Sequence, residues 1–149
     1  MKPRSLLASL ILVSMLSIAL AACGETAAAP PASTTSTASG PTAVQVTLSD
    51  FKIQPSLTTF KAGVVYHFVV TNNGPSTHEF MAGPISAANA SESERDEVKL
   101  FEIEEMEPGQ TATQDYTFTQ PYSAGTLEFS CHVAGHYEQG MRLDFTVVA

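Results

Sequence analysis

Much of the chain after residue 43 consists of short stretches rich in valine, phenylalanine, tyrosine and threonine, a pattern that few folds accommodate. Turn-forming clusters separate these stretches, among them NNGP at residues 72–75 and EPG at residues 107–109. Many short strands at such spacing favour an antiparallel β-sandwich or barrel. The sequence therefore predicts an all-β domain over residues 44–149. The expected strands are residues 44–48, 64–72, 77–82, 98–104, 111–119, 125–131 and 142–148.

One polar segment interrupts this pattern. Ser91 and Glu94 have the spacing of a capping box, so we expect a short surface helix over residues 91–97. Residues 92–107 hold eight acidic residues against two basic ones. Charge runs of this kind usually form a solvated face, and a docking surface is the alternative.

The N-terminus predicts export. Lys2 and Arg4 precede an apolar run over residues 6–20, which is too short for a comfortable membrane span and is typical of a secretory signal. The run ends in LAAC, which resembles the lipobox of bacterial lipoproteins. That resemblance implies a signal peptide over residues 1–22, lipid on the sulfur of Cys23, and an extracytoplasmic location on the bacterial cell membrane. The alternative is an ordinary cleavage site with an incidental cysteine.

Residues 23–43 are expected to form a lipid-anchored tether. They are rich in alanine, serine, threonine and proline and contain no large apolar residue, so they cannot bury enough surface to fold. Loss of the signal would leave five basic and fifteen acidic residues in the mature chain. This balance argues against nucleic acid as a partner, because phosphate binding needs a basic patch. It fits either a basic protein partner or a role in solubility alone.

The chain has two cysteines, and if Cys23 carries lipid then Cys131 has no partner. A lone thiol in an oxidising compartment needs protection, either by burial or by a bound metal. Leu127, Phe129 and Cys131 alternate along one predicted strand, so they should share the core face.

The donor residues in 131–141 suggest that a bound metal protects the Cys131 thiol. Cys131, His136 and Met141 lie five residues apart in turn, and Gly135 and Gly140 would let the backbone fold back between them. Thiolate, imidazole and thioether donors together select copper over zinc or iron.

A copper site of this type also needs a second histidine. His78 follows a turn at the start of a predicted strand, where binding residues tend to lie, and is the candidate we favour. His67 lies in the middle of a strand and is better explained as a half-exposed surface residue. His132 should point away from Cys131, because neighbouring residues alternate. It is either an exposed histidine or a second, weak metal position or electron exit.

The residues Cys131-x4-His136-x4-Met141, with His78 upstream in a THEF stretch, resemble the cupredoxin family. These are type 1 blue copper proteins such as plastocyanin and azurin, and the loop spacing is most similar to rusticyanin-type and sulfocyanin-type members. The resemblance covers residues 44–149. It implies a Greek-key β-sandwich of about seven or eight strands, with one copper bound by His78, Cys131, His136 and Met141. It also implies that electrons leave through His136 at an apolar surface patch.

Two departures from family patterns matter. Many cupredoxins have asparagine after the first histidine, where it helps to tie the ligand loops together, and this chain has Glu79. Ser130 stands where multicopper oxidases have the first histidine of His-Cys-His, and four histidines are too few for their additional copper cluster.

The resemblance implies an electron carrier rather than an enzyme: a monomer that exchanges single electrons with protein redox partners. Membrane-bound respiratory or photosynthetic components are candidate partners. The alternative function is copper sequestration, delivery or resistance, for which the same ligands would serve. A third hypothesis, a domain that has lost its metal, is disfavoured because all four ligand positions are intact.

Overall fold

A computed structural model of the chain describes residues 40–149. The predicted signal peptide, Cys23 and most of the predicted tether lie outside the described residues. No helix within residues 40–149 is long and apolar enough to cross a membrane.

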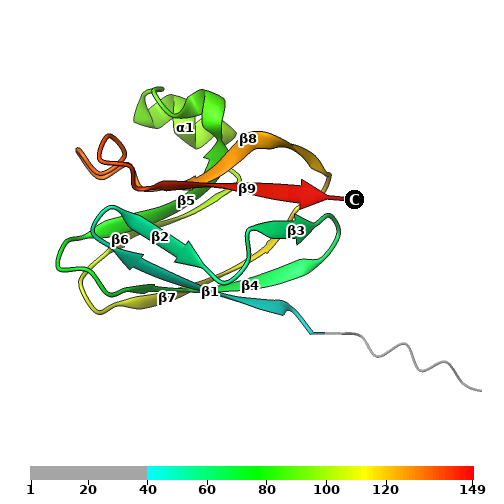
Figure 1. The fold of residues 1–149 in the computed structure, drawn as a ribbon, viewed down its shortest axis with the longest axis horizontal. Helices are drawn as coiled ribbons and strands as arrows, with labels where there is room; N and C mark the ends of the chain where they lie inside the picture. The colour runs from blue at the N-terminus through cyan, green and yellow to red at the C-terminus, as the bar shows by residue number, and fades with distance from the viewer. Residues whose placement is uncertain (1–39) are drawn as a thin grey trace, which may run out of the picture. The chain divides into compact units, whose positions relative to one another are not determined.

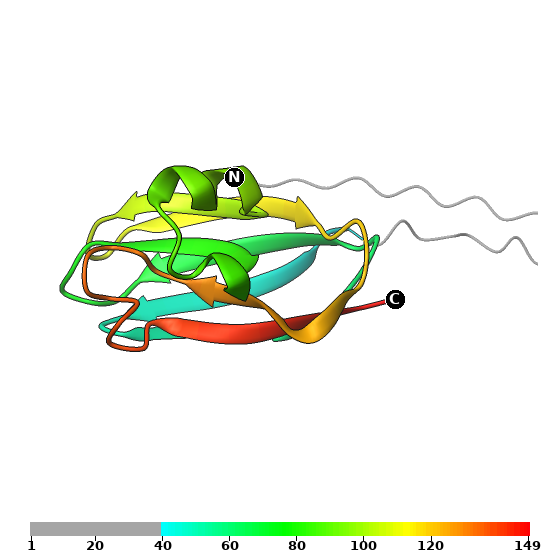
Figure 2. The same ribbon diagram turned by 90° about the horizontal axis from the view of Figure 1, so that it is seen from above.

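Two β-sheets pack face to face over the described residues (Figures 1 and 2). The first sheet has the strand order β2-β1-β4-β7, and the second has the order β3-β9-β8-β5-β6. The strands of the first sheet are β1 (Thr42–Ser49), β2 (Lys52–Pro55), β4 (Val65–Asn72) and β7 (Thr111–Thr117). Those of the second sheet are β3 (Thr59–Lys61), β5 (His78–Pro84), β6 (Phe101–Met106), β8 (Tyr122–Ser130) and β9 (Arg142–Val148).

The predicted all-β sandwich is confirmed, with two corrections of detail. Each of the seven predicted segments contains a strand, but residues 40–149 also contain the short strands β2 and β3, which bring the total to nine. These two strands have four and three residues and bury one residue each. They are too short to show the alternation of apolar and polar residues that would mark them as strands in the sequence. The pairings of β1 with β4 and of β3 with β9 are parallel, whereas the sequence suggested only antiparallel strands.

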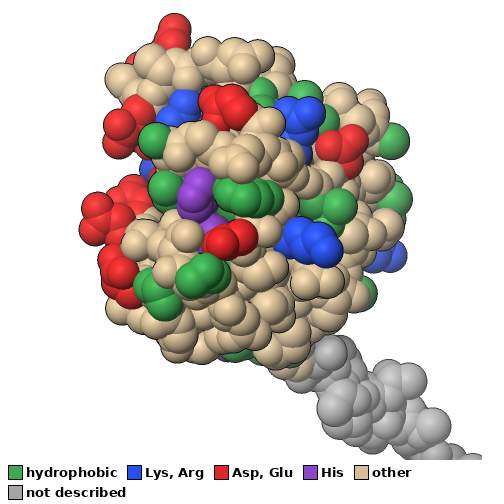
Figure 3. Space-filling view, turned by 60° about the vertical axis from the view of Figure 1, so that its left-hand side comes forward, with side chains coloured by type: hydrophobic (Ala, Val, Ile, Leu, Met, Phe, Trp, Pro, Cys, Tyr) green, Lys and Arg blue, Asp and Glu red, His purple; other side chains and the backbone are tan. Residues whose placement is uncertain are grey.

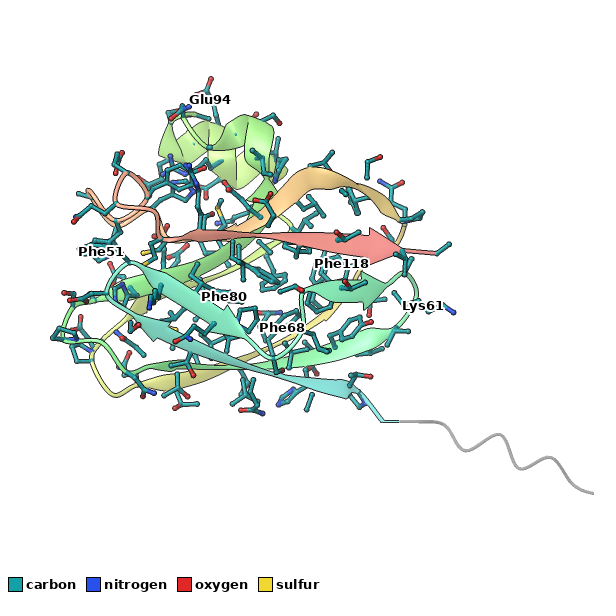
Figure 4. All side chains as sticks on the ribbon, in the orientation of Figure 1. Phe51, Lys61, Phe68, Phe80, Glu94 and Phe118 are labelled. Carbon is teal, nitrogen blue, oxygen red and sulfur yellow. The ribbon has the colours of Figure 1, made fainter. Side chains whose placement is uncertain are left out.

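An aromatic core fills the space between the sheets. Strand β4 alternates strictly between buried and more exposed residues, as a half-buried strand should. Figure 4 shows Phe68, Phe80 and Phe118 between the two layers. The rings pack in edge-to-face and offset geometries, which add to the free energy of burying their apolar area. The fully buried phenylalanines are Phe60, Phe68, Phe80, Phe118, Phe129 and Phe145.

The helix predicted after Ser91 is present as α1 (Glu92–Val98), and its capping box is confirmed. The Ser91 hydroxyl accepts a hydrogen bond from the Glu94 amide, and the Glu94 carboxylate accepts one from the Ser91 amide. Together with a 3₁₀ turn (Ile85–Ala87), α1 lies against strands β5 and β8 of the second sheet. Strand β8 is consequently buried on both faces at its end, where Glu128 and Ser130 are buried as well as Leu127 and Phe129.

The carboxyl group of Glu128 is buried from solvent, which is unusual for a glutamate. It is 1% exposed, and one carboxylate oxygen accepts a hydrogen bond of 2.9 Å from the Tyr137 hydroxyl. The other oxygen has no hydrogen-bond partner among the described residues. Burial raises the pKa of Glu128, and the hydrogen bond from Tyr137 and the charge of Arg142 offset this only in part.

Replacing Glu128 by glutamine should stabilise the metal-free protein at neutral pH. Because the folded-state pKa of Glu128 is raised, its unfavourable contribution is absent below the unfolded pKa of about 4.3 and grows as pH rises towards the folded pKa. Glutamine keeps the acceptor for Tyr137 and carries no charge, so the variant should be more stable by roughly 1 kcal/mol at pH 7. Urea unfolding at pH 7 and pH 4 measures the difference.

The control for this prediction is Glu97→Gln, which makes the same chemical change on the exposed surface of α1. It should change the unfolding free energy little at either pH. The prediction is wrong if Glu128→Gln is less stable than the unsubstituted protein at pH 7, or if its advantage is undiminished at pH 4.

Candidate metal centre

Three of the predicted ligands meet at one end of the sandwich. His78 is the first residue of β5, Cys131 directly follows β8, and His136 lies in the loop between β8 and β9. The Sγ atom of Cys131 is 3.5 Å from Nδ1 of His136 and 3.9 Å from Nδ1 of His78. The two Nδ1 atoms are 3.1 Å apart. Strand pairing of β5 with β8 brings His78 next to Cys131, although 53 residues separate them in sequence.

The spacing of these atoms suits a metal ion. A point equidistant from the three atoms lies about 2 Å from each, close to typical metal–nitrogen distances of ~2.0–2.1 Å and metal–sulfur distances of ~2.3 Å. One thiol and two imidazoles with a nearby thioether form a donor set that copper prefers. Among residues 40–149, no other group of three histidine, cysteine or acidic side chains gathers closely enough to hold a metal ion.

The loop after Cys131 folds back as the glycines predicted. Gly135 and Gly140 have φ angles of 84° and 94°, a left-handed conformation that glycine adopts without strain. The turn brings Met141 back to the site, where its carbonyl accepts a hydrogen bond of 3.1 Å from the Cys131 amide. The Met141 amide donates to the His136 carbonyl, also at 3.1 Å. The Met141 side chain is fully buried, and its backbone hydrogen bonds join the fourth predicted ligand to Cys131 and His136.

Burial favours the uncharged forms of Cys131 and His78. Burial raises the pKa of the Cys131 thiol, and amide hydrogen bonds from Glu79 and Val133 offset the effect in part. Burial, followed by the charge of His136, lowers the pKa of His78. A neutral imidazole is the form that binds metal, whereas the thiol has to lose its proton when a metal binds.

Glu79 stands where many cupredoxins have asparagine, and it also forms hydrogen bonds between the two ligand segments. Its carboxylate accepts a hydrogen bond of 2.5 Å from the His132 amide, and its own amide donates to Cys131 Sγ at 3.5 Å. These two contacts join the start of β5 to Cys131 and His132, the two residues that follow β8. The structure therefore identifies how the ligand segments are held together in the absence of asparagine.

His132 points away from the ligand cluster. Its ring stacks on Tyr137 with a centroid distance of 4.8 Å, and its Nε2 is 3.1 Å from the Ser130 hydroxyl. Burial and the nearby charge of Arg95 lower the pKa of His132 to about 4. His132 is half-buried rather than exposed, and it lines a hollow of about 230 Å³ together with Arg95 and Glu138.

His67 takes no part in the cluster. It lies on β4, where its Nδ1 is 2.5 Å from the carboxylate of Asp115 on β7. Two residues that the sequence analysis did not single out do touch the site. Asp50 and Phe51 form the turn between β1 and β2, and they lie beside His78 and His136 respectively. No signal in the local sequence marks them, because only the pairing of distant strands places this turn at the site.

Comparisons with known proteins agree with this geometry. No protein-family model matches the chain. The chain is 29% identical over 106 residues to the copper-resistant cuproprotein CopI of Rubrivivax gelatinosus, a match that covers 66% of this chain and 61% of that protein. It is 28% identical over 140 residues to CopI of Pseudomonas aeruginosa, covering 70% of this chain and 75% of that one.

Solved structures with a similar fold include auracyanins, one of them described as a "blue" copper protein, and an azurin. An auracyanin from Roseiflexus castenholzii matches with a TM-score of 0.59 and 16% identity over 72% of this chain and 98% of its own. Auracyanin A from Chloroflexus aurantiacus matches with a TM-score of 0.52 and 19% identity over 73% and 98%. An azurin from Methylomonas sp. strain J has a TM-score of 0.51 and 12% identity over 71% and 95%.

The chain therefore has a cupredoxin-like fold, with a cysteine–histidine cluster where the resemblance stated from the sequence placed the copper ligands. Its relatives in sequence include two copper-resistant cuproproteins named CopI.

Proposed function

We propose that the chain is a membrane-tethered, extracytoplasmic copper protein that carries single electrons between redox partners. The observation that carries this proposal is the convergence of Cys131 Sγ with Nδ1 of His78 and His136, all within 3.9 Å of one another. Met141 is the fourth ligand in this proposal. The chain acts on no substrate, so it is not an enzyme.

Bound copper would supply one-electron cycling between Cu(I) and Cu(II). The protein's own contribution is to hold the ligands in place and keep water out. His78, Cys131 and Met141 are fully buried, and Glu79 ties the start of β5, which carries His78, to Cys131 and His132. Ligands positioned in advance by a packed core move little when the charge at the site changes, which favours rapid electron exchange.

The surface at the site suits a protein partner. His136 is the one partly exposed member of the cluster found within residues 40–149. Figure 3 shows a histidine surface flanked by hydrophobic side chains, with acidic side chains gathered to its left. Strand β1 begins at the opposite end of the sandwich (Figure 1), so a tether there would leave the site free to meet a partner. We infer that the working unit is a monomer and that its partners are membrane-bound electron-transfer proteins rather than nucleic acids.

A second candidate function is copper resistance. Two relatives carry the name copper-resistant cuproprotein, and this favours a role in binding or passing on copper outside the cytoplasm. The two functions make different demands on the site. An electron carrier has to keep its metal through many redox cycles, whereas a copper carrier has to release it to a competing ligand.

Visible absorption and EPR of the Cu(II)-loaded full chain, followed by redox titration, test the proposal. We expect an intense thiolate-to-copper charge-transfer band, a small copper hyperfine splitting and reversible one-electron cycling without metal loss. A colourless copper complex would contradict the proposed centre. Loss of copper on reduction, or ready transfer to a competing chelator, would replace electron transfer by copper handling.

A further inference from the structure

The turn between β1 and β2 packs directly against both candidate histidine ligands. Phe51 has a positive φ of 57°, and its ring meets that of His136 edge-on with a centroid distance of 5.5 Å. Its neighbour Asp50 places a carboxylate oxygen 3.5 Å from Nε2 of His78. A non-glycine residue at positive φ costs free energy, and here that residue and its neighbour Asp50 both contact the candidate metal site. Figure 4 shows Phe51 at the end of the sandwich that carries the β8–β9 loop.

The Nε2 atom of His78 is a buried polar atom without a hydrogen-bond partner among the described residues. The His78 side chain is fully buried, so water does not reach it readily. Gly74 closes the other side, because a Cβ atom there would lie 2.8 Å from Nε2 and 3.2 Å from the Asp50 carboxylate. The space around Nε2 therefore contains the Asp50 carboxylate and is too narrow for a side chain at residue 74.

Metal binding would turn this unpartnered atom into a hydrogen-bond donor. The Nδ1 atom of His78 faces Cys131 and His136, so Nδ1 is the atom that would bind the metal. A neutral imidazole whose Nδ1 binds a metal carries its proton on Nε2. That N–H would then point into the space that holds the Asp50 carboxylate, and a small rotation would shorten the 3.5 Å separation to a hydrogen bond.

We propose that Asp50 is a positioning residue for the metal centre. Its carboxylate accepts the Nε2–H of His78, which selects the tautomer that presents Nδ1, and its negative charge favours Cu(II) over Cu(I). The proposal rests on the copper function proposed above. A carboxylate that orients a ligating histidine is a recurrent way to tune a metal site. Because the Asp50 side chain is 39% exposed, solvent screens its charge, and we expect a moderate effect.

The first test is Asp50→Asn, which removes the charge and keeps an oxygen that can accept the hydrogen bond. We expect the ratio of Cu(II) to Cu(I) affinity to fall by about tenfold, equivalent to a rise of about 59 mV in reduction potential. The matched control is Asp115→Asn, which removes the same charge from the other histidine–carboxylate pair, on the outer side of the first sheet. The control should leave the potential close to that of the unsubstituted protein.

The second test is Asp50→Ala, read by ¹⁵N NMR of His78 in the diamagnetic Cu(I)-loaded full chain. We expect the unsubstituted protein to show one tautomer with a slowly exchanging Nε2–H, and the alanine variant to exchange that proton at least about tenfold faster with solvent. The proposal is overturned if Asp50→Asn and Asp115→Asn have the same potential, or if the alanine variant exchanges no faster. Failure of the copper function itself looks different, because the unsubstituted protein would then lack the charge-transfer band.

Discussion

Replacing Cys131 by serine should abolish the intense visible absorption of the copper-loaded protein. The expected band arises from charge transfer between thiolate sulfur and Cu(II), and Cys131 supplies the one thiol in the histidine cluster of the described residues. Changes to residues that only support metal ligands commonly lower affinity by about 10–100-fold. Loss of a ligand should therefore lower Cu(I) affinity by more than about 100-fold. Absorption spectroscopy and competition with a Cu(I) chelator measure the two effects.

The adjacent residue provides the control for Cys131→Ser. His132 is bonded directly to Cys131, but its ring points away and stacks on Tyr137. His132→Ala should therefore keep the band and the copper affinity. The metal-free variants should also be compared by thermal unfolding, because a serine hydroxyl at a fully buried position costs stability on its own. A blue Cys131→Ser protein, or a colourless His132→Ala protein, would contradict the assignment of the thiol.

The candidate ligands could be proposed from the sequence because their residue types and spacing lie within short segments of the chain. The segment from Cys131 to Met141 holds three kinds of donor and two glycines, and the glycine φ angles show that the backbone turns there as expected. His78 could be chosen over His67 because it follows a turn, and binding residues gather at the ends of strands. The structure places His78, and not His67, next to Cys131.

The supporting residues could not be predicted, because tertiary contacts decide their roles. Glu79 reads in the sequence as the loss of an asparagine, yet its carboxylate binds the His132 amide across the β5–β8 pairing. Asp50 lies in the turn between β1 and β2, and only the tertiary fold places its carboxylate 3.5 Å from Nε2 of His78. The burial of Glu128 could not be predicted for the same reason. Its strand has the alternating sequence of a half-exposed strand, and Glu128 is buried only because residues 85–98 and Tyr137 cover it.

The core and the metal site share strand β8, and this coupling suggests the substitution with the largest expected effect on stability. Phe129 lies two residues before Cys131 and is fully buried. Its ring stacks on those of Phe145 and Phe80 at centroid distances of 4.2 and 4.9 Å. Phe129→Ala removes these contacts and leaves a cavity, which typically costs about 3–5 kcal/mol. For a domain whose unfolding free energy is on the order of 5–15 kcal/mol, the metal-free variant should be close to unfolding at 37 °C.

Copper should restore much of the unfolding free energy that Phe129→Ala removes. A ligand that binds only the folded state stabilises it by about 2.7 kcal/mol when its concentration is 100 times its dissociation constant. Urea unfolding of the variant with and without metal measures both effects, and its copper-loaded form should keep the charge-transfer band. The control is Val148→Ala on β9, which removes apolar atoms from a side chain that is 45% exposed and should cost less than about 0.5 kcal/mol. If Phe129→Ala costs no more than Val148→Ala, the stacked rings do not hold the sandwich together. If the variant is folded but its copper-loaded form is colourless, then side-chain packing around β8 is needed to position the Cys131 thiol. The backbone hydrogen bonds of Cys131 would not be sufficient by themselves.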